Sequence, residues 1–376
     1  MRLLHTSDWH LGRTLHGIDL LEHQAAFVDH LVDVVRGEDV DALLVAGDVY
    51  DRAIPPAEAV DLLADGLARL AELTTVVLTS GNHDSPARLG FGAALMRERV
   101  RLRTRVSSVG EPVLVGDTLV YGLPYLEPDF ARVQLSDEDA PLPRSHTAVL
   151  SAAMGRVRAD RASRPQPRAV VMAHAFVTGG AASDSERDIR VGGVDHVPAD
   201  VFAGVDYVAL GHLHGPQQVA PGIRYSGSPL AYSFSEKDHH KSSVLVDLGA
   251  DEPAVELVPA PVPRRLSDVT GTSEEVLGAR FEAQVGDWVR VTVTDEHRPA
   301  DLQARVRSRF PHALQVLHEP AGDAAASRAV AVGAASDPLE VAGEFVRHVT
   351  GAAPTPDEAA VLRRAYEAVT AGTRSA

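Results

Sequence analysis

The stretch Leu43-Leu44-Val45-Ala46-Gly47-Asp48-Val49-Tyr50-Asp51 joins an uninterrupted apolar run to a glycine and two carboxylates. The run has the length and composition of a buried strand. A glycine at its end lets the backbone turn sharply, so that the side chain of Asp48 projects outward, and Gly81 and Gly211 are expected to do the same. The stretch therefore predicts a strand of an α/β sheet with a carboxylate just beyond its carboxyl end.

Four more apolar runs are followed in the same way by oxygen or imidazole side chains. They are 2–4, followed by His5-Thr6-Ser7-Asp8-Trp9-His10; 75–78, followed shortly by Gly81-Asn82-His83-Asp84; 169–173, followed by His174; and 207–210, followed by Gly211-His212-Leu213-His214. A single Asp or Asn-His after a strand is usually a turn residue or a polar pair. Five such endings together predict one site, because α/β sheets bind ligands at the carboxyl ends of their strands.

The predicted donors are oxygen and imidazole without sulfur, because the chain has no cysteine. That absence excludes disulfides, thiolate catalysis and Cys-bound zinc or iron–sulfur centres. Mixed oxygen and imidazole donors suit Mn²⁺, Fe or Zn²⁺ better than Ca²⁺. There are enough donors for two divalent ions that share a carboxylate, and such sites promote in-line displacement at phosphorus.

The charge balance is acidic: 36 Lys and Arg against 52 Asp and Glu give a net charge of −16 over 376 residues. This argues against nucleic-acid binding through a diffuse basic surface. Charge interrupts the first residues before any apolar core of signal-peptide length, and no run approaches the ~18 apolar residues of a membrane span. We therefore expect a cytoplasmic protein that does not enter a membrane.

Helical spacing of apolar residues predicts helices over about 20–35 and 57–73, between the first three strands. Residues 223–225 and 243–248 are expected to be strands of a hairpin-like region, and the basic stretch 156–168 a mobile loop. The alternation of strands and helices predicts an α/β domain.

The domain organisation follows from shifts in composition. Prolines cluster at 259–263, where we place a boundary, and a later stretch is rich in Ala, Gly and Ser. The predicted parts are an α/β domain over 1–260, a small α+β unit over 261–320, a linker over 321–336 and a helical pair over 337–376.

Each helix of the predicted pair begins at a capping pattern, Asp337-Pro338 and Thr355-Pro356-Asp357-Glu358. Apolar residues recur on one side of each helix. The candidate contact residues are Leu339, Phe345, Val349, Leu362 and Val369. The pair could dock on its own chain or bind a partner, and the pattern leaves both open.

Taken in order, the strand-end motifs resemble those of the calcineurin-like metallophosphoesterases. Further stretches are similar to the SbcD family of bacterial nuclease subunits: Thr6-Ser7-Asp8-Trp9-His10-Leu11-Gly12-Arg13, Asn82-His83-Asp84-Ser85-Pro86-Ala87-Arg88-Leu89, Ser183-Asp184-Ser185-Glu186-Arg187 and Tyr225-Ser226-Gly227-Ser228-Pro229. The resemblance implies a sandwich of two mixed sheets flanked by helices, with a DNA-capping α+β domain and partner-binding helices at the C-terminus.

The resemblance also implies roles for the site residues. The first of two manganese ions would be held by Asp8, His10 and His214, the second by Asn82, His174 and His212, with Asp48 bridging both. His83 would face the scissile phosphate and stabilise charge or protonate the leaving oxygen, and Asp84 would orient His83. Some relatives have a histidine where this chain has Asp51, so Asp51 is expected to order its loop.

By resemblance the chain is a DNA exonuclease and endonuclease in DNA end processing, replication, repair and recombination. It would work with an SbcC-type coiled-coil ATPase, as a homodimer within a heterotetramer. One alternative is a small-molecule or protein phosphoesterase with the same metal core, which would not need the region after 260. The other is a chiefly architectural subunit that clamps DNA ends.

Overall fold

Two six-stranded sheets form the larger of the two units into which the chain divides, Met1–Ser267 and Asp268–Ala376. The computed structural model describes residues 1–376 except 97, 166–167, 188, 190–195, 250–251, 321–336, 351 and 374–376. The predicted linker 321–336 therefore lies outside the described residues.

The first sheet has the order β14 (Ala254–Pro259), β13 (Ser242–Asp247), β1 (Arg2–Thr6), β4 (Ala42–Ala46), β5 (Thr75–Thr79), β6 (Val100–Arg103). The second has the order β11 (Gln217–Ala220), β12 (Ile223–Tyr225), β10 (Tyr207–Gly211), β9 (Arg168–His174), β8 (Thr118–Gly122), β7 (Val113–Val115). The helices of this unit are α1 (Leu21–Gly37), α2 (Ala57–Leu73), α3 (Pro86–Leu89), α4 (Pro128–Gln134) and α5 (His146–Ala162). Shorter elements are β2 (Thr14–Leu15), β3 (Ile18–Asp19), and the 3₁₀ turns η1 (Val106–Ser108), η2 (Ala199–Phe202) and η3 (Phe234–Glu236).

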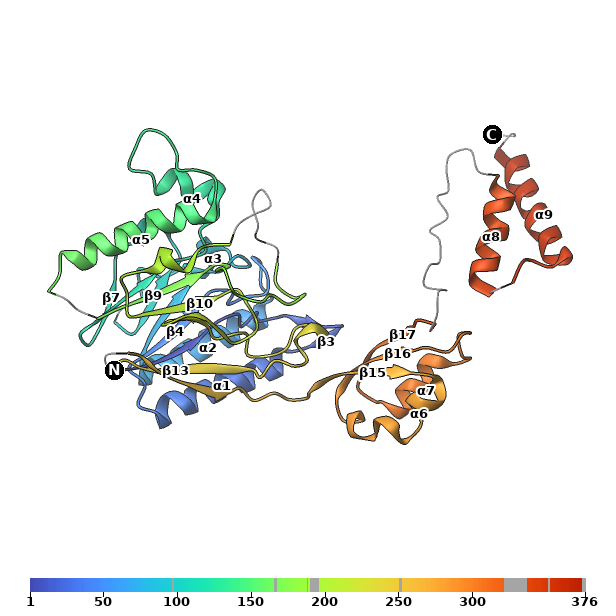
Figure 1. The fold of residues 1–376 in the computed structure, drawn as a ribbon, viewed down its shortest axis with the longest axis horizontal. Coiled ribbons are helices and arrows are strands. Elements are labelled where there is room, and N and C mark those ends of the chain that lie inside the picture. Colours follow the sequence, from blue (N-terminus) through green and yellow to red (C-terminus); the bar gives the residue numbers. More distant parts are fainter. Residues whose placement is uncertain are drawn as a thin grey trace. The chain divides into compact units, whose positions relative to one another are not determined.

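The larger unit has four layers, with the two sheets face to face and helices on their outer sides (Figure 1). In β4, Ala42, Leu44 and Ala46 pack into the core between the sheets, whereas Leu43 and Val45 pack with α1 and α2. The helix α5 covers the outer side of β8, β9 and β10 in a separate core. Because both faces of β4 are buried, its sequence is apolar throughout instead of alternating. This confirms the predicted sandwich of mixed sheets.

Parallel pairing aligns the carboxyl ends of the strands that precede the predicted ligands. In the first sheet, β4 lies parallel to both β1 and β5, with Ala46 opposite Thr79. In the second sheet, β9 lies parallel to β10, with Gly211 opposite His174. The turns after these strands therefore open at one edge of each sheet.

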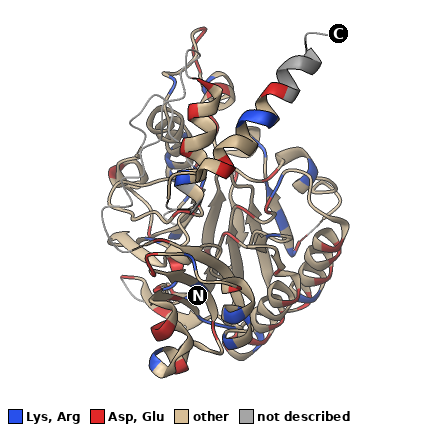
Figure 2. Cartoon of the chain, turned by 90° about the vertical axis from the view of Figure 1, so that its right-hand side faces the viewer, with Lys and Arg blue, Asp and Glu red and all other residues tan. Residues whose placement is uncertain are grey.

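Two local predictions are wrong. The strands at 223–225 and 243–248 do not form a hairpin, because β12 pairs with β10 and β11 in one sheet while β13 pairs with β1 and β14 in the other. The basic stretch from 156 is not a loop but continues α5 to Ala162, where Val157 is buried. Figure 2 shows that acidic and basic residues lie mainly on helices and loops, around largely uncharged strands.

The second unit contains a three-stranded sheet of order β15 (Leu266–Gly271), β16 (Trp288–Val293), β17 (Ala313–His318). Its helices are α6 (Ser273–Leu277) and α7 (Leu302–Arg309), with the 3₁₀ turn η4 (Ala279–Gln284). A capping box starts α6 at Thr272, with Glu275 as its partner. Val291, Val306 and Phe310 lie in its fully buried core.

The C-terminal helices α8 (Pro338–Thr350) and α9 (Pro356–Thr373) are present where the capping patterns predict them. Thr355 exchanges hydrogen bonds with Glu358 at the start of α9. Phe345 and Val349 are 66% and 64% exposed, so these two candidate contact residues face solvent. The side chain of Val369 lies outside the described part of the structure. None of the described helices combines the length and apolar character needed to cross a membrane.

Candidate metal centre

Six of the seven predicted ligands lie in the turns after β1, β4, β5 and β10, and His174 is the last residue of β9. Four of them have a left-handed backbone: φ is 54° at Asp8, 46° at His10, 48° at Asp48 and 106° at His212. Such conformations cost non-glycine residues on the order of 1–3 kcal/mol and concentrate at functional sites. The fold therefore holds these side chains inward at an energetic cost.

The glycines beside the ligands act in two ways. Gly47 has φ +83°, which gives the sharp turn that the sequence predicts. Gly81 and Gly211 are not among the positive-φ residues, so the bends that follow them do not depend on a left-handed glycine. Instead they permit close approach: a Cβ on Gly81 would lie 2.2 Å from Asp48 Oδ1, and one on Gly211 would lie 1.8 Å from the carbonyl oxygen of Ala46.

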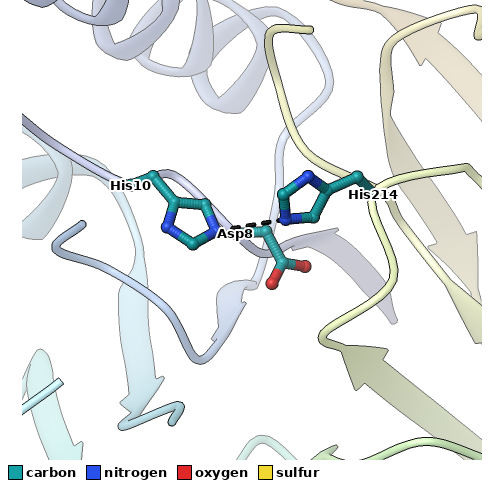
Figure 3. Close-up of side chains that lie close together, drawn as sticks. All are labelled: Asp8, His10 and His214. Carbon is teal, nitrogen blue, oxygen red and sulfur yellow. Dashed lines mark hydrogen bonds between the residues drawn. The ribbon is translucent and has the colours of Figure 1, made fainter. Parts of the chain in front are cut away.

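The first predicted ligand set converges. Asp8, His10 and His214 are buried and offer ligand atoms within 4.8 Å of one another. Figure 3 shows the imidazoles of His10 and His214 turned toward each other beside the carboxylate of Asp8, with their Nε2 atoms 3.1 Å apart. His214 Nδ1 lies 2.7 Å from Ser185 Oγ and 3.1 Å from Glu236 Oε1. Because the carboxylate can only accept, Nδ1 carries the proton and Nε2 presents its lone pair to the site.

The second set also converges. His174 Nδ1 donates to the carbonyl oxygen of Ala46 at 3.0 Å, so Nε2 faces the site and offers a lone pair there once it has lost its proton. That Nε2 atom lies 2.9 Å from Asn82 Oδ1, and His212 Nδ1 lies 3.3 Å from the same oxygen. Asn82 Oδ1 thus lies within hydrogen-bond distance of both imidazole nitrogens, so three potential ligand atoms meet at one point.

Asp48 lies between the two sets. Its Oδ2 atom is 3.4 Å from His174 Nε2 and 3.7 Å from His10 Nε2. Its Oδ1 atom accepts a hydrogen bond of 2.8 Å from the backbone N–H of His83. One carboxylate oxygen therefore faces both sets, as a bridging ligand would.

The pKa values of Asp8 and His174 indicate that the buried carboxylates of this site require a compensating positive charge. Burial raises the pKa of Asp8 to about 6. Burial alone would lower the pKa of His174, but the charge on Asp48 and its hydrogen bond raise it to about 9. A proton on His174 thus compensates the buried carboxylates when no cation is bound. The imidazole nitrogens and carboxylate oxygens that converge at these points are suitable ligand atoms for two divalent cations.

His83 lies at the rim of this donor set. Its Nδ1 donates to the carbonyl oxygen of Asp51 at 2.7 Å, and its Nε2 lies 3.8 Å from Asp48 Oδ2. Its side chain is 5% exposed, and burial lowers its pKa. The structure also groups His83 with His10 and Asp48 as atoms within 4.8 Å of one another. The ring is therefore neutral, with Nε2 directed at the space beside Asp48.

Asp84 has a different role from the predicted one. Its carboxylate accepts hydrogen bonds from the backbone N–H groups of Val49 at 3.1 Å, Tyr50 at 2.9 Å and Gly81 at 2.9 Å. It does not orient the His83 ring, whose Nδ1 is held by Asp51. Asp84 therefore joins the turn after β4 to the turn after β5. Burial raises the pKa of Asp84 to about 7.

Two buried charged residues behind His214 are not singled out by the strand-end pattern. Glu236 forms an ion pair with Lys241, and their side chains are 0% and 2% exposed. Glu236 contacts the ring of His214, as described above. The signal in the sequence is weak: Lys241 is one of two lysines in a chain whose other 34 basic residues are arginines.

Comparison with known proteins places both parts of the chain. The family model of the calcineurin-like phosphoesterases matches residues 1–216, and that of the type 5 capsule protein repressor C-terminal domain matches 262–350. The SbcD subunit of the nuclease SbcCD from Bacillus subtilis (strain 168) is 40% identical over 275 residues, and the match covers 68% of each chain.

Two solved structures share 14% identity with the chain. They are TT1561 of Thermus thermophilus, with a TM-score of 0.39 over 68% of this chain and 98% of that one, and a dimetal phosphatase from Danio rerio, with a TM-score of 0.42 over 69% and 96%.

Proposed function

Because this chain belongs to the calcineurin-like phosphoesterase family, we propose that it is a metal-dependent DNA nuclease and the nuclease subunit of an SbcCD-type complex. It hydrolyses phosphodiester bonds as an exonuclease and an endonuclease in DNA end processing, replication, repair and recombination. The observation that carries this proposal is the convergence of Asp8, His10, Asp48, His174 and His214 on common points, in a chain 40% identical to a named nuclease subunit.

The two cations are proposed to be Mn²⁺. The first would be held by Asp8, His10 and His214, the second by Asn82, His174 and His212, and both by Asp48. This assignment is supported by the Nε2–Nε2 distance of 3.1 Å between His10 and His214, and by the position of Asp48 Oδ2 near both sets. Such ions bind phosphodiester oxygens and lower the pKa of a bound water, so that hydroxide is available near neutral pH.

His83 contributes through its Nε2 atom. Since Nδ1 is held by the Asp51 carbonyl, the ring is fixed in one orientation. In the neutral ring Nε2 carries no proton; a proton taken up there would make His83 an imidazolium, which would stabilise the phosphate charge or protonate the leaving oxygen. The carboxylate of Asp51 lies 3.5 Å from Arg13 Nη1. This ion pair orders the loop that supplies the Asp51 carbonyl to His83.

The remaining parts of the chain are proposed to bind DNA and a partner. Residues 261–320 would cap the DNA, and α8 and α9 would bind an SbcC-type coiled-coil ATPase through residues such as Phe345 and Val349, both exposed. With a net charge of −16, the chain alone should bind DNA weakly at physiological salt. The ATPase and a second copy of the nuclease chain would complete a heterotetramer in the cytoplasm.

The test is cleavage of end-labelled linear duplex DNA by the purified chain, with Mn²⁺ or EDTA, alone and with its ATPase partner. A bis-aryl phosphodiester is assayed in parallel, and Asp48→Ala is the inactive control. Mn²⁺-dependent DNA cleavage that Asp48→Ala abolishes supports the proposal. Turnover of the bis-aryl ester without DNA cleavage, even with the ATPase, would instead indicate a small-molecule phosphoesterase. DNA-end binding without hydrolysis of either substrate would indicate an architectural subunit.

A further inference from the structure

His214 is held at every polar atom except the one that faces the metal position. Its backbone N–H donates to Glu186 Oε1 at 2.8 Å, and its carbonyl oxygen accepts from Lys241 Nζ at 3.0 Å. Its Nδ1 atom bonds to Ser185 Oγ and Glu236 Oε1. Only Nε2 remains, and it points toward His10.

Glu236 connects the ring of His214 to a buried cation. Its Oε1 atom faces His214 Nδ1 and also accepts from Ser185 Oγ and the backbone N–H of Tyr232. Its Oε2 atom bonds to Lys241 Nζ. A carboxylate with no solvent exposure would be costly by itself, and Lys241 supplies the charge that compensates it.

The ammonium of Lys241 suits this place better than a guanidinium. Its three N–H donors meet three acceptors, the carboxylate of Glu236, the carbonyl of His214 at 3.0 Å and Ser228 Oγ at 2.9 Å. A guanidinium is larger, and its five donors lie in a flat fork that does not match three acceptors around one atom. This accounts for a buried lysine in a chain with 34 arginines and two lysines.

We infer that Glu236 and Lys241 are positioning residues that fix the tautomer and direction of His214, and so set the affinity of the metal position formed by Asp8, His10 and His214. This inference rests on the proposed role of His214 as a metal ligand. Carboxylates bonded to the far nitrogen of a ligating histidine orient the ring and make it a stronger donor. Lys241 acts on the same residue from its backbone, so the pair holds His214 at both ends.

The test compares Mn²⁺ binding with stability in matched variants. Binding is followed by calorimetry and by the electron paramagnetic resonance signal of free Mn²⁺, and the melting temperature is measured in EDTA. Glu236→Gln should weaken one of the two ions by about 10- to 100-fold and leave the other unchanged. Lys237→Met is the matched control, because Lys237 is exposed and pairs with Asp238, and it should change neither ion.

Lys241→Met alone leaves Glu236 buried without its cation, so it is expected to lower the melting temperature and could prevent folding. The double variant Glu236→Gln/Lys241→Met removes both buried charges, so it separates a loss of stability from a loss of metal affinity. Positioning predicts that the double variant regains melting temperature while one ion stays weakly bound. Affinities that return together with stability, or two ions weakened equally, would show that the pair serves only the fold.

His214→Gln separates this inference from the proposed function. Loss of one ion in His214→Gln, with wild-type binding in Glu236→Gln and in the double variant, would overturn the inference and leave the proposed ligand intact. Wild-type binding of both ions by His214→Gln would overturn the ligand assignment itself, and the inference with it.

Discussion

Binding of Mn²⁺ should release a proton from His174 and should therefore strengthen as pH rises. In the metal-free site, burial opposes the charged imidazole, but Asp48 raises the pKa of His174 to about 9. The imidazole is then almost fully protonated at pH 7. A histidine must be neutral at the nitrogen that binds a metal, so the cation has to displace this proton.

The magnitude follows from that exchange. One proton released for one ion bound means a tenfold gain in affinity per pH unit between pH 7 and 8, or about 1.4 kcal/mol. Burial raises the pKa of Asp8 to about 6. Only below that pH should a second proton, released from Asp8, steepen the dependence of Mn²⁺ affinity on pH. Above pH 9 the dependence on His174 should level off.

The stability of the metal-free protein should change with pH in the opposite direction. The pKa of His174 in the folded state lies above its unfolded value of 6.5. The stability that protonated His174 contributes to the folded state is therefore present in full below pH 6.5 and is lost as pH rises through 9. A difference of about 2.5 pKa units corresponds to roughly 3 kcal/mol, so the melting temperature in EDTA should be lower at pH 9 than at pH 6.5.

Calorimetric titration of Mn²⁺ at pH 7 and pH 8, in two buffers with different ionisation enthalpies, counts the released protons directly. The wild-type chain should release about one proton per pair of ions at pH 7. The control His174→Gln should bind fewer ions and release no proton in this range. Equal Mn²⁺ affinity at both pH values, with heats that do not depend on the buffer, would refute the reasoning.

Three further predictions test separate parts of the chain. His83→Gln should keep both ions, as measured by elemental analysis, and its turnover should fall by about 10²- to 10⁴-fold. Asp48→Ala should lose both ions. Loss of metal from His83→Gln would instead make His83 a ligand. Gly81→Ala should lose bound metal because its Cβ would clash with Asp48. Gly155 is exposed in α5 and has open space around it, so the control Gly155→Ala should raise the free energy of unfolding by about 0.5–1 kcal/mol. Deletion of 337–376 should abolish complex formation with the ATPase and spare turnover of a bis-aryl phosphodiester; retained complex formation on a sizing column would place the docking surface elsewhere.

The strands and the oxygen and imidazole side chains that follow them were predictable because their signals are local. A fully buried strand must be apolar on both faces, and the apolar run predicted as a strand from Leu43 lies in β4, Ala42–Ala46. The donors follow such strands within a few residues, and parallel strands bring their carboxyl ends to one edge. The capping pattern at Thr355 was equally local, and it is present.

Pairing between distant strands was not predictable in the same way. The strands β12 and β13 are near neighbours in the sequence, which favoured a hairpin, yet they belong to different sheets. The end of α5 was also misjudged, because the basic residues after 156 hide a helix whose Val157 reaches the core. In both regions burial against another layer decides the structure.

By itself, the sequence determined which side chains offer oxygen and imidazole donors and where the strands that carry them end, since both depend on residue type and short spacing. Only the tertiary structure decided which atom of each side chain faces the site. It placed the carbonyl of Asp51, and not the carboxylate of Asp84, against the ring of His83, and it placed Glu236 and Lys241 behind His214. The physical reason is that a buried hydrogen bond depends on the distance and direction between atoms, and residues more than twenty positions apart acquire these only when the layers pack.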